Sequence, residues 1–522
     1  MPTVAVIGGG PSGLVSAKEA RDARMDPTVF EKADTIGGLW RGTHGKTWAS
    51  LRTNLSKFTC AFSDLPWDST SEAFPLSGAV ARYLNRYAQT FGLYSCIKLN
   101  VTVTRVTEAS GCYQVEWLEG GLQHAACFDY VIVATGIFSI PHAPSGLEGF
   151  GRPLVHASEF RDATRFKELR VLVVGAAFSG ADIAAAIARV ASHVTLVASA
   201  TRPHYYLPRY VDGQPIDLVL YSRAASDADS QLSKEQQWTK RHGALQRLGG
   251  QLAGLPPPRF DAPPFVAVSD DLRDAMGEGR ISVTTSRVRE ASDGLVVFED
   301  GSRAEYDTIV TATGYRTALD FLSPPLQRAV EWEPSDWLQP LLLHRGVWPA
   351  PTVSGLAFVG MYRGPFFAVM ELQARWACAV FSARLPRPSH TEIEHGLDEE
   401  RAVRRSRPRP QFPHGDYVTM ADDLARRIGA WPAAALENSA HPLHSLLRDG
   451  PLLPFHFRLE GHHAKPRLAE EAIRQCARLH PFSLRHSQRR HTSSIALASA
   501  ALAAALVAFA VCRRPWAELR LL

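Results

Sequence analysis

Short runs of consecutive apolar residues recur along the chain, and two of them lead straight into glycine-rich turns. Residues 4–7 and 171–174 are such runs, and each is followed by a helix-favouring segment and a second predicted strand, at residues 28–30 and 193–197. Apolar runs of this length are typical of strands buried on both faces. Strands that alternate with helices predict β-α-β units with parallel strands.

Further runs extend both units. Residues 129–136 and 306–315 are β-branched runs that each contain Ala-Thr-Gly, and residues 356–360 form one more apolar run before a glycine. The pattern therefore predicts an α/β fold of two dinucleotide-binding domains, with the second inserted in the first. The other predicted elements are helices over 79–94 and from 371, strands over 98–106, 112–117, 281–285 and 295–298, a loop-rich insertion over 211–265, an exposed connection over 386–416 and helical pieces over 417–480.

The order of these elements predicts four segments along the chain. Residues 1–150 form the first part of one Rossmann-like domain, and residues 151–314 form the inserted domain. Residues 315–480 return to the first domain and add C-terminal helices, and residues 481–522 form a basic tail.

The first turn carries the pattern G-x-G-x-x-G, in which the glycines allow a tight turn, close approach to a pyrophosphate and helix–strand packing. The helix N-terminus that follows favours anions. Glu31 ends the second strand 18 residues after Gly13, near the spacing of about 20 at which an acid binds ribose hydroxyls. The turn residues are Gly8, Gly9, Gly10, Pro11, Ser12 and Gly13. This stretch predicts nucleotide binding.

The second turn has the same spacing but places Ala177 at the middle glycine position. No acid follows its second strand, and Thr201 and Arg202 stand there instead. An arginine at this point fits a ribose 2′-phosphate and therefore NADP; a solvated arginine in a loop is the alternative. The candidate residues of this turn and its helix are Gly175, Ser179, Gly180, Ala181 and Asp182.

Composition adds little beyond a globular class. The chain has 522 residues, of which 45% are hydrophobic and 21% charged, with a net charge of +5. No basic stripe with interleaved aromatics suggests nucleic acid. The seven cysteines are scattered without a C-x-x-C, which argues against a disulfide framework or a zinc site and for reduced thiols in a protein that faces the cytosol. We expect no signal peptide, because the first strand begins near residue 4.

The tail contains an uncharged stretch of 18 residues, 495–512, between Arg489-Arg490 and Arg513-Arg514. As a helix it would span roughly 27 Å, just under the ~30 Å of a hydrocarbon core. We expect a C-terminal membrane anchor here. A helix that packs on the body or lies at the membrane surface is the alternative, since half of the stretch is alanine.

Taken together, these motifs resemble the flavin-containing monooxygenases of animals, over about residues 3–480. Besides both turns, the resemblance rests on the motif that ends in Gly38-Leu39-Trp40, on Thr53-Asn54, on residues 62–67 (Phe-Ser-Asp-Leu-Pro-Trp) and on Thr313-Gly314. It also includes residues 371–376, with Gln373, and residues 457–459 (Phe-Arg-Leu). These motif positions, from Gly38 to Gln373, are implied to bind cofactor.

Two positions depart from that family's pattern. In the motif F-x-G-x-x-x-H-x-x-x-F/Y, Phe150, His156 and Phe160 match, but Arg152 takes the place of the glycine. The other departure is Ala177. Both put cofactor affinity, rather than the fold, in question. His156 is equally well explained as a histidine of a domain connection.

The resemblance implies FAD at the first turn, NADPH at the second, and oxygenation of amines or thioethers by O2 through a C4a-hydroperoxyflavin. It implies that Asn54 lies beside the flavin and stabilises this intermediate; from the sequence alone, a helix cap is an equal reading of Asn54. Arg209 is a further candidate for the 2′-phosphate. The implied location is the cytosolic face of the endoplasmic reticulum membrane, with the cytoplasm as the alternative.

Three rival functions remain open. A Baeyer–Villiger monooxygenase acting on ketones would use the same cofactors, but such enzymes carry tryptophan where Phe160 stands. An NADPH-dependent flavoprotein reductase usually needs a redox cysteine pair, which the sequence lacks. A nucleotide-binding scaffold would consume no NADPH.

Overall fold

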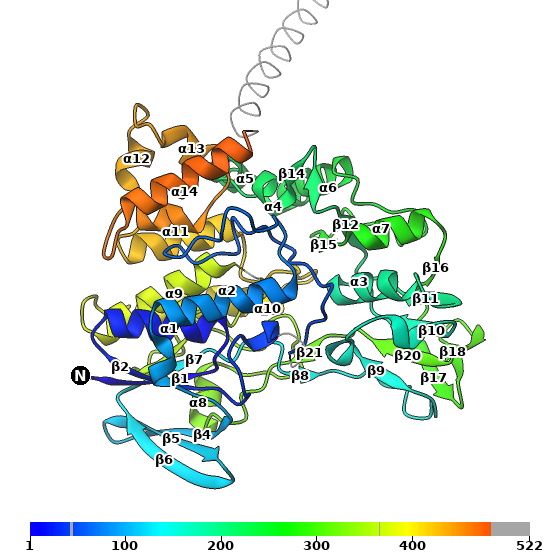
Figure 1. Cartoon of the computed structure of the whole chain (residues 1–522), viewed down its shortest axis with the longest axis horizontal. Helices are drawn as coiled ribbons and strands as arrows, with labels where there is room; N and C mark the ends of the chain where they lie inside the picture. The colour runs from blue at the N-terminus through cyan, green and yellow to red at the C-terminus, as the bar shows by residue number, and fades with distance from the viewer. Residues whose placement is uncertain (42–44, 365, 482–522) are drawn as a thin grey trace, which may run out of the picture.

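The computed structural model describes residues 1–41, 45–364 and 366–481 (Figure 1). Two five-stranded parallel sheets lie side by side in it. The first, in the order β22-β7-β1-β2-β3, joins β22 (Leu356–Phe358), β7 (Tyr130–Val133), β1 (Thr3–Ile7), β2 (Asp26–Phe30) and β3 (Ile97–Lys98). The second, in the order β16-β11-β10-β20-β9, joins β16 (Ile281–Thr284), β11 (His193–Val197), β10 (Arg170–Val174), β20 (Thr308–Thr311) and β9 (Leu154–His156).

The first sheet is covered on both faces, which explains its continuous apolar strands. Val4 and Val6 of β1 contribute to a core with α1 (Pro11–Asp22), α2 (Ser77–Thr90) and α9 (Phe367–Phe381). Ala5 and Ile7 point to the other face, into a core shared with the antiparallel strands β4 (Val101–Ala109), β5 (Cys112–Glu119) and β6 (Leu122–Phe128).

The second sheet repeats this arrangement. Val171 and Val173 of β10 pack in a core with α3 (Phe178–Ile187) and α7 (Asp270–Gly277). Leu172 and Val174 face the antiparallel strands β17 (Val288–Ser292), β18 (Leu295–Phe298) and β19 (Arg303–Glu305). Each half is therefore a parallel sheet between helices and a small antiparallel sheet.

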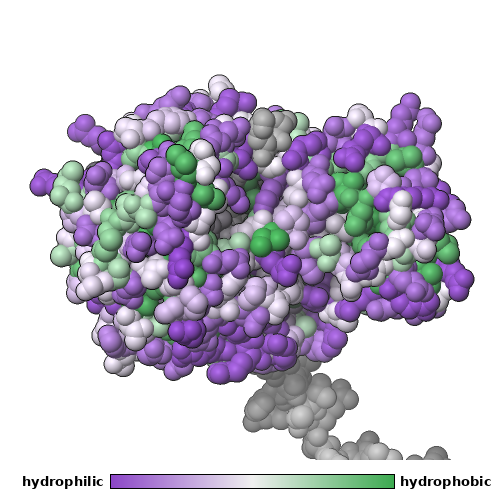
Figure 2. Space-filling model, turned by 90° about the horizontal axis from the view of Figure 1, so that it is seen from below, coloured by the Kyte–Doolittle hydropathy of each residue, from purple (hydrophilic) through white to green (hydrophobic). Residues whose placement is uncertain are grey.

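The chain crosses between the halves twice, and the crossings pair as β8 (Ile140–Pro141) and β21 (Tyr315–Arg316). Figure 2 shows the surface hollowed between a larger and a smaller lobe, with apolar side chains in small groups. The remaining elements are β12 (His204–Leu207), β13 (Tyr210–Val211), β14 (Gln214–Pro215), β15 (Phe265–Val268), α4 (Ile216–Leu220), α5 (Arg223–Ser230), α6 (Lys234–Arg247), α8 (Pro324–Ala329), α10 (His390–Arg405), α11 (Tyr417–Arg427), α12 (Ala433–Glu437), α13 (His444–Arg448), α14 (Pro466–Leu479) and the 3₁₀ turns η1 (Gly38–Trp40), η3 (Leu93–Cys96), η4 (Ala157–Glu159), η5 (Thr164–Phe166) and η6 (Pro454–Arg458).

Two predicted loops are helical instead. The insertion over 211–265 contains α4, α5 and α6, and Ser233 begins α6 with a capping box. The expected connection over 386–416 contains α10, which Ser389 caps and which buries Ile393 and Leu397, four residues apart. A stripe this narrow on an otherwise charged helix gives little periodic signal.

No helix in the described part of the chain is both long and apolar enough to cross a membrane. The predicted anchor, residues 495–512, lies outside the described residues.

Candidate functional site

The first glycine turn leaves no room for a side chain at Gly8 or Gly13. Gly8 adopts φ +109°, and a Cβ on it would lie 2.6 Å from the carbonyl oxygen of Ala134. A Cβ on Gly13 would lie 1.8 Å from the carbonyl oxygen of Gly8. The turn therefore requires glycine at both positions, and it brings the start of α1 close against β1.

The second turn has the same shape. Gly175 adopts φ +105° with Ala312 as its neighbour, and a Cβ on Gly180 would lie 1.7 Å from the carbonyl oxygen of Gly175. Ala177 has φ −78° and ψ −166°, close to the φ −77° and ψ −175° of Gly10 at the matching position. Since any residue adopts this extended conformation, alanine causes no backbone strain there.

Both turns fit an anionic pyrophosphate. Neither α1 nor α3 has a side chain that caps its N-terminus. A helix N-terminus left in this way offers backbone N–H groups and a partial positive charge to a phosphate. Pro11 and Ser12 form the first turn of α1, while Ser179, Gly180 and Ala181 follow Phe178 at the start of α3.

Glu31 lies directly behind the first turn. Its side chain is 6% exposed and accepts hydrogen bonds from the backbone N–H of Gly9, at 2.6 Å, and of Ala33, at 2.9 Å. Each carboxylate oxygen keeps a further lone pair. Glu31 thus braces the turn and retains acceptors for a ribose.

The Gly38-Leu39-Trp40 turn packs on the first glycine turn. Gly37 donates its N–H to the carbonyl of Gly9 at 2.9 Å. A Cβ on Gly38, which has φ +57°, would lie 3.0 Å from the Cα of Gly10. Leu39 and Trp40 complete η1. The two glycine motifs, separate in the sequence, form one surface.

Thr53 and Asn54 carry buried polar atoms without partners. The Thr53 hydroxyl and the Asn54 side-chain oxygen are both buried and have no hydrogen-bond partner among the described residues. Burying such atoms unsatisfied costs roughly 1–3 kcal/mol each. A ligand that supplies the missing hydrogen bonds would remove this cost, so these atoms mark a candidate ligand contact.

The second half of the molecule holds the Asn54 loop in place. Asp217 accepts hydrogen bonds from the Ser56 N–H at 3.0 Å, the Ser56 hydroxyl at 2.7 Å and the Thr59 hydroxyl at 2.6 Å. The Arg209 guanidinium donates to the carbonyl oxygen of Thr53 at 3.2 Å. Sequence reasoning missed this role of Asp217, because its partners lie about 160 residues away.

Asp182 supports Arg209 from behind. Its carboxylate lies 3.6 Å from the Arg209 guanidinium, and the Ser269 hydroxyl donates to it. Burial raises the pKa of Asp182 to about 6, and Arg209 opposes that rise. Arg209 also pairs with Asp270 at 3.1 Å. The structure thus places Arg209 among carboxylates and the Asn54 loop, and its guanidinium is not left free for a phosphate.

Thr201 and Arg202 form an exposed cationic corner. The Thr201 hydroxyl lies 3.2 Å from that of Ser199, which accepts from the backbone N–H of Arg202 at the same distance. The Arg202 guanidinium stacks over Trp337 at 4.7 Å and forms no ion pair with any described residue. Partial burial, together with Arg287 and Arg409, lowers its pKa. An unpaired arginine among cations favours a phosphate ligand.

Thr313 and Gly314 lie where the two crossings run together. The Thr313 hydroxyl donates to the carbonyl of His142, and the Gly314 carbonyl accepts from the His142 N–H at 3.0 Å. His156 Nε2 lies 3.1 Å from the same Gly314 carbonyl, and Ser158 N–H donates to its Nδ1. This arrangement gives His156 a structural contact with the domain connection.

Gln373 is fully buried within the fold. It accepts from the Gly360 N–H at 2.9 Å and donates to the Gly346 carbonyl at 3.2 Å. Gln373 therefore fixes the loop that follows β22.

The other motifs of the sequence converge on Arg458, whose side chain is fully buried. Its guanidinium lies 2.8 Å from Glu371, 3.1 Å from Glu19 and 3.3 Å from Asp64, and its Nε donates to the Ser63 hydroxyl at 2.7 Å. We call this set, with Lys18 and Arg375, the Arg458 cluster. It joins α1, residues 62–67, α9 and the C-terminal segment, which explains these motifs as structural.

Comparison with known proteins shows to which family the chain is similar. Residues 2–513 match the family model for flavin-binding monooxygenase-like proteins. The chain is 31% identical over 488 residues to flavin-containing monooxygenase 5 of Rattus norvegicus, covering 88% of this chain and 89% of that protein. It is also 31% identical to dimethylaniline monooxygenase [N-oxide-forming] 2 of Mus musculus, with 88% of each covered.

Solved structures share the fold. S-allyl-L-cysteine S-oxygenase of Allium sativum superimposes with a TM-score of 0.60 at 21% identity, covering 94% of this chain and 98% of that one. The open form of cyclohexanone monooxygenase gives a TM-score of 0.60 at 17% identity, covering 82% and 98%. With two dinucleotide turns of one shape and this agreement over nearly the whole chain, the protein belongs to the flavin-binding monooxygenase-like family, the FAD-dependent monooxygenases that use NADPH.

Proposed function

We propose that the protein oxygenates soft nucleophiles, amines or thioethers, with FAD held at the first turn and NADPH at the second. The main observation behind the assignment of FAD to the first turn and NADPH to the second is a difference between these two turns, which otherwise have the same backbone shape. The first has a carboxylate, Glu31, at the ribose position, and the second has an unpaired guanidinium, Arg202. A carboxylate accepts from ribose hydroxyls and repels a 2′-phosphate, whereas arginine attracts one.

The proposed division of the chain follows from this assignment. Residues 1–150 and 315–480 hold FAD, and residues 151–314 hold NADPH. The FAD pyrophosphate binds at the first turn, which consists of Gly8, Gly9, Gly10, Pro11, Ser12 and Gly13. The FAD site extends to Gly38, Leu39 and Trp40. The NADPH pyrophosphate binds at Gly175, Ser179, Gly180 and Ala181, and its 2′-phosphate contacts Thr201 and Arg202. Thr313 and Gly314 line the crossing between them, while Asp182 and Gln373 position neighbouring residues.

FAD bound at the first turn would, with electrons from NADPH, supply the chemistry that activates O2. The chain contributes position and exclusion of water, as in other cofactor enzymes. Asn54 is our candidate catalytic residue because its buried side-chain oxygen has no partner in the described protein. Arg209 and Asp217, which belong to the segment proposed to hold NADPH, hold the Asn54 loop in place.

The test is Asn54→Ala, with Asn85→Ala on α2 as the matched control. We expect Asn54→Ala to keep FAD but to divert NADPH electrons from product to hydrogen peroxide, by about 10-fold or more in the peroxide-to-product ratio. Asn85→Ala is expected to behave as the parent protein. Unchanged coupling in Asn54→Ala would remove the catalytic role of this residue.

A parallel assay with a sulfide, an amine and a ketone separates this function from its nearest rival. Sulfoxide or N-oxide without ester supports the proposal, whereas an ester formed at the same rate supports a Baeyer–Villiger reaction.

We further propose that residues 495–512 attach the protein to the cytosolic face of the endoplasmic reticulum membrane. The support is in the sequence: 18 uncharged residues between two arginine pairs, which suit acidic headgroups. Flotation of the full chain with liposomes, compared with a chain ending at residue 481, tests this. Equal flotation of both would overturn it.

A further inference from the structure

Two cysteines of the small antiparallel sheet beside the first parallel sheet lie on its solvent-facing surface. Cys112 is the first residue of β5, and Cys127 is the last but one of β6; both strands lie at the lower left of Figure 1. Their neighbours Tyr113 and Phe128 are buried in the core under this sheet. Because side chains alternate between the faces of a strand, Cys112 and Cys127 point to the opposite face. There Cys127 is exposed and Cys112 is half-buried.

The register of the β5–β6 hairpin brings the two sulfur atoms together. Cys127 lies opposite Gln114, and Cys112 lies two residues before Gln114, so the cysteines are diagonal neighbours on adjacent strands. Gly120 and Gly121, both at positive φ, form a two-residue turn that suits the right-handed twist of a hairpin. This twist draws the diagonal between Cys112 and Cys127 together. The two thiols form a hydrogen bond, which raises the pKa of Cys112.

The other cysteines that the structure describes are shielded. Cys60, Cys378 and Cys476 are buried, and burial raises the pKa of each thiol. The Cys96 thiol donates to a backbone carbonyl at 3.1 Å, and partial burial raises its pKa as well. Oxidation of a thiol requires that an oxidant can reach its sulfur. Among the described cysteines, Cys127 is therefore the most accessible, and Cys112 is the neighbour that can react with it next.

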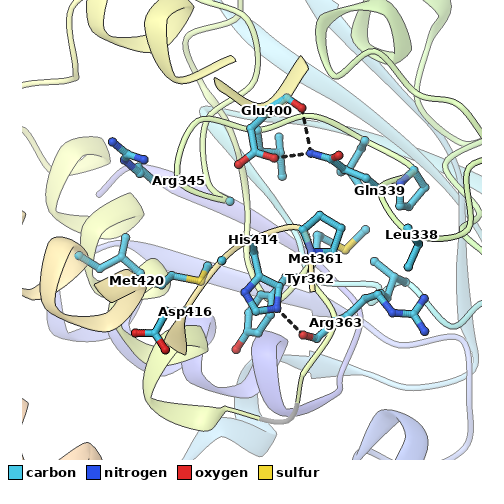
Figure 3. A pocket seen from close by; sticks show the side chains of 18 of the residues that line it. Leu338, Gln339, Arg345, Met361, Tyr362, Arg363, Glu400, His414, Asp416 and Met420 are labelled. Atoms are coloured by element: carbon cyan, nitrogen blue, oxygen red, sulfur yellow. Dashed lines mark hydrogen bonds between the residues drawn. The ribbon is translucent and has the colours of Figure 1, made fainter. Parts of the chain in front are cut away.

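This cysteine pair lies apart from the sites proposed for the cofactors. None of the described residues that line the cavity in Figure 3 is a cysteine, and neither glycine turn contains one. The sheet contacts the FAD half through its buried face, where Trp117 packs against Phe30 with their ring centroids 5.0 Å apart. A bond between the cysteines on the outer face would join β5 to β6 and leave these contacts in place.

We propose that Cys112 and Cys127 form a reversible disulfide when the protein meets hydrogen peroxide, which is released when electrons from NADPH do not reach a substrate. The Cys127 sulfur attacks one peroxide oxygen, the O–O bond breaks, and a sulfenic acid and one water form. The Cys112 sulfur then attacks the Cys127 sulfur. The S–S bond forms as the S–O bond breaks, and the hydroxyl leaves with the Cys112 proton as a second water. The two thiols lose two electrons, and the peroxide gains them.

Peptide mapping of the full-length, FAD-loaded protein after treatment with hydrogen peroxide tests this. No NADPH is added, so the result does not depend on the proposed oxygenation. Trypsin releases residues 106–161 as one peptide, which contains Cys112 and Cys127 and no other cysteine. We expect this peptide to resist alkylation and to lose the mass of two hydrogen atoms. Cleavage after Glu116 and Glu119 then separates the two cysteines, and a disulfide would hold the fragments together until dithiothreitol is added.

Cys112→Ser removes the thiol that resolves the sulfenic acid. In this variant we expect dimedone, which traps sulfenic acids, to label Cys127 about tenfold more than in the parent. Cys96→Ser is the matched control, because it removes a half-buried thiol on another element and is expected to form the disulfide as the parent does.

The mapping of the parent protein needs no variant, so it decides the matter even if Cys112→Ser fails to fold. Two alkylatable thiols in peptide 106–161 after peroxide treatment would overturn the proposal. So would Cys127 oxidised to sulfinic acid without a cross-link, or joined to a second copy of the chain instead of to Cys112.

Discussion

Replacing Arg458 with methionine tests how the family motifs hold this fold together. The guanidinium faces Glu19, Asp64 and Glu371 within 3.3 Å, and its side chain is 0% exposed. In the Arg458 cluster, three buried carboxylates face three cations, Lys18, Arg375 and Arg458 itself, and Lys18 also pairs with the partly exposed Asp22 at 2.9 Å. Arg458→Met therefore leaves one buried negative charge in excess.

Removing one partner of a buried ion pair costs about 3–5 kcal/mol. At about 2–4 °C per kcal/mol, the value for units of 150–250 residues, this would lower the unfolding temperature by roughly 6–20 °C; the unit formed by residues 1–150 and 315–480 is larger, so we expect a shift toward the lower end. We expect this shift in thermal unfolding followed by tryptophan fluorescence. Adding Glu371→Gln to Arg458→Met restores charge balance and is expected to recover part of the loss.

The control is Arg474→Met, which removes an exposed ion pair with Glu470 in α14. An exposed pair of this kind contributes about 0.3–0.5 kcal/mol, so the control is expected to move the transition by less than about 2 °C. If Arg458→Met shifts the transition no more than Arg474→Met does, the reasoning about the Arg458 cluster is wrong.

Three further outcomes are expected. Asp217→Asn weakens the anchor of the Asn54 loop, so peroxide release per NADPH rises while FAD content stays constant; equal coupling contradicts this. Arg202→Gln raises the KM for NADPH by about tenfold and leaves that for NADH unchanged, because only NADPH carries the 2′-phosphate; an unchanged NADPH preference contradicts it. Although burial opposes it, Lys18, Arg458 and Arg375 lower the pKa of Glu19 from 4.5 to about 2. The stabilisation of the fold by ionised Glu19 is therefore present above pH 4.5 and lost as the pH falls toward 2. Acid unfolding tests this: between pH 4.5 and 2, Arg458→Met is expected to lose less stability than the parent protein does.

The sequence predicted the parts of this fold that depend on local pattern. Residues 4–7 and 171–174 are strands of sheets that are covered on both faces. Because no side chain of such a strand faces solvent, every position in it is apolar, and the sequence shows this as a continuous apolar run. The glycine turns follow from sterics within a few residues. Predictions of this kind need no knowledge of distant partners.

Predictions failed or fell short where long-range contacts decide. The helix α10 was expected as a connection because only Ile393 and Leu397 mark its buried stripe. Asp217 carries no local signal, since its contacts with Ser56 and Thr59 arise only after the two halves meet. The backbone contacts of Gln373 with Gly360 and Gly346 also carry no local signal, and its contact with a cofactor stays a prediction.

The most direct measurement of the central claim is a complete electron balance on the purified full-length protein. NADPH consumption, oxygenated product and hydrogen peroxide are quantified together with a panel of amines and sulfides, while the bound flavin is followed by absorbance. We expect a yellow protein that forms N-oxide or sulfoxide nearly in step with NADPH oxidation for at least one substrate. A flavin-loaded protein that consumes NADPH but forms only peroxide with every amine and sulfide, or that consumes none, would contradict it.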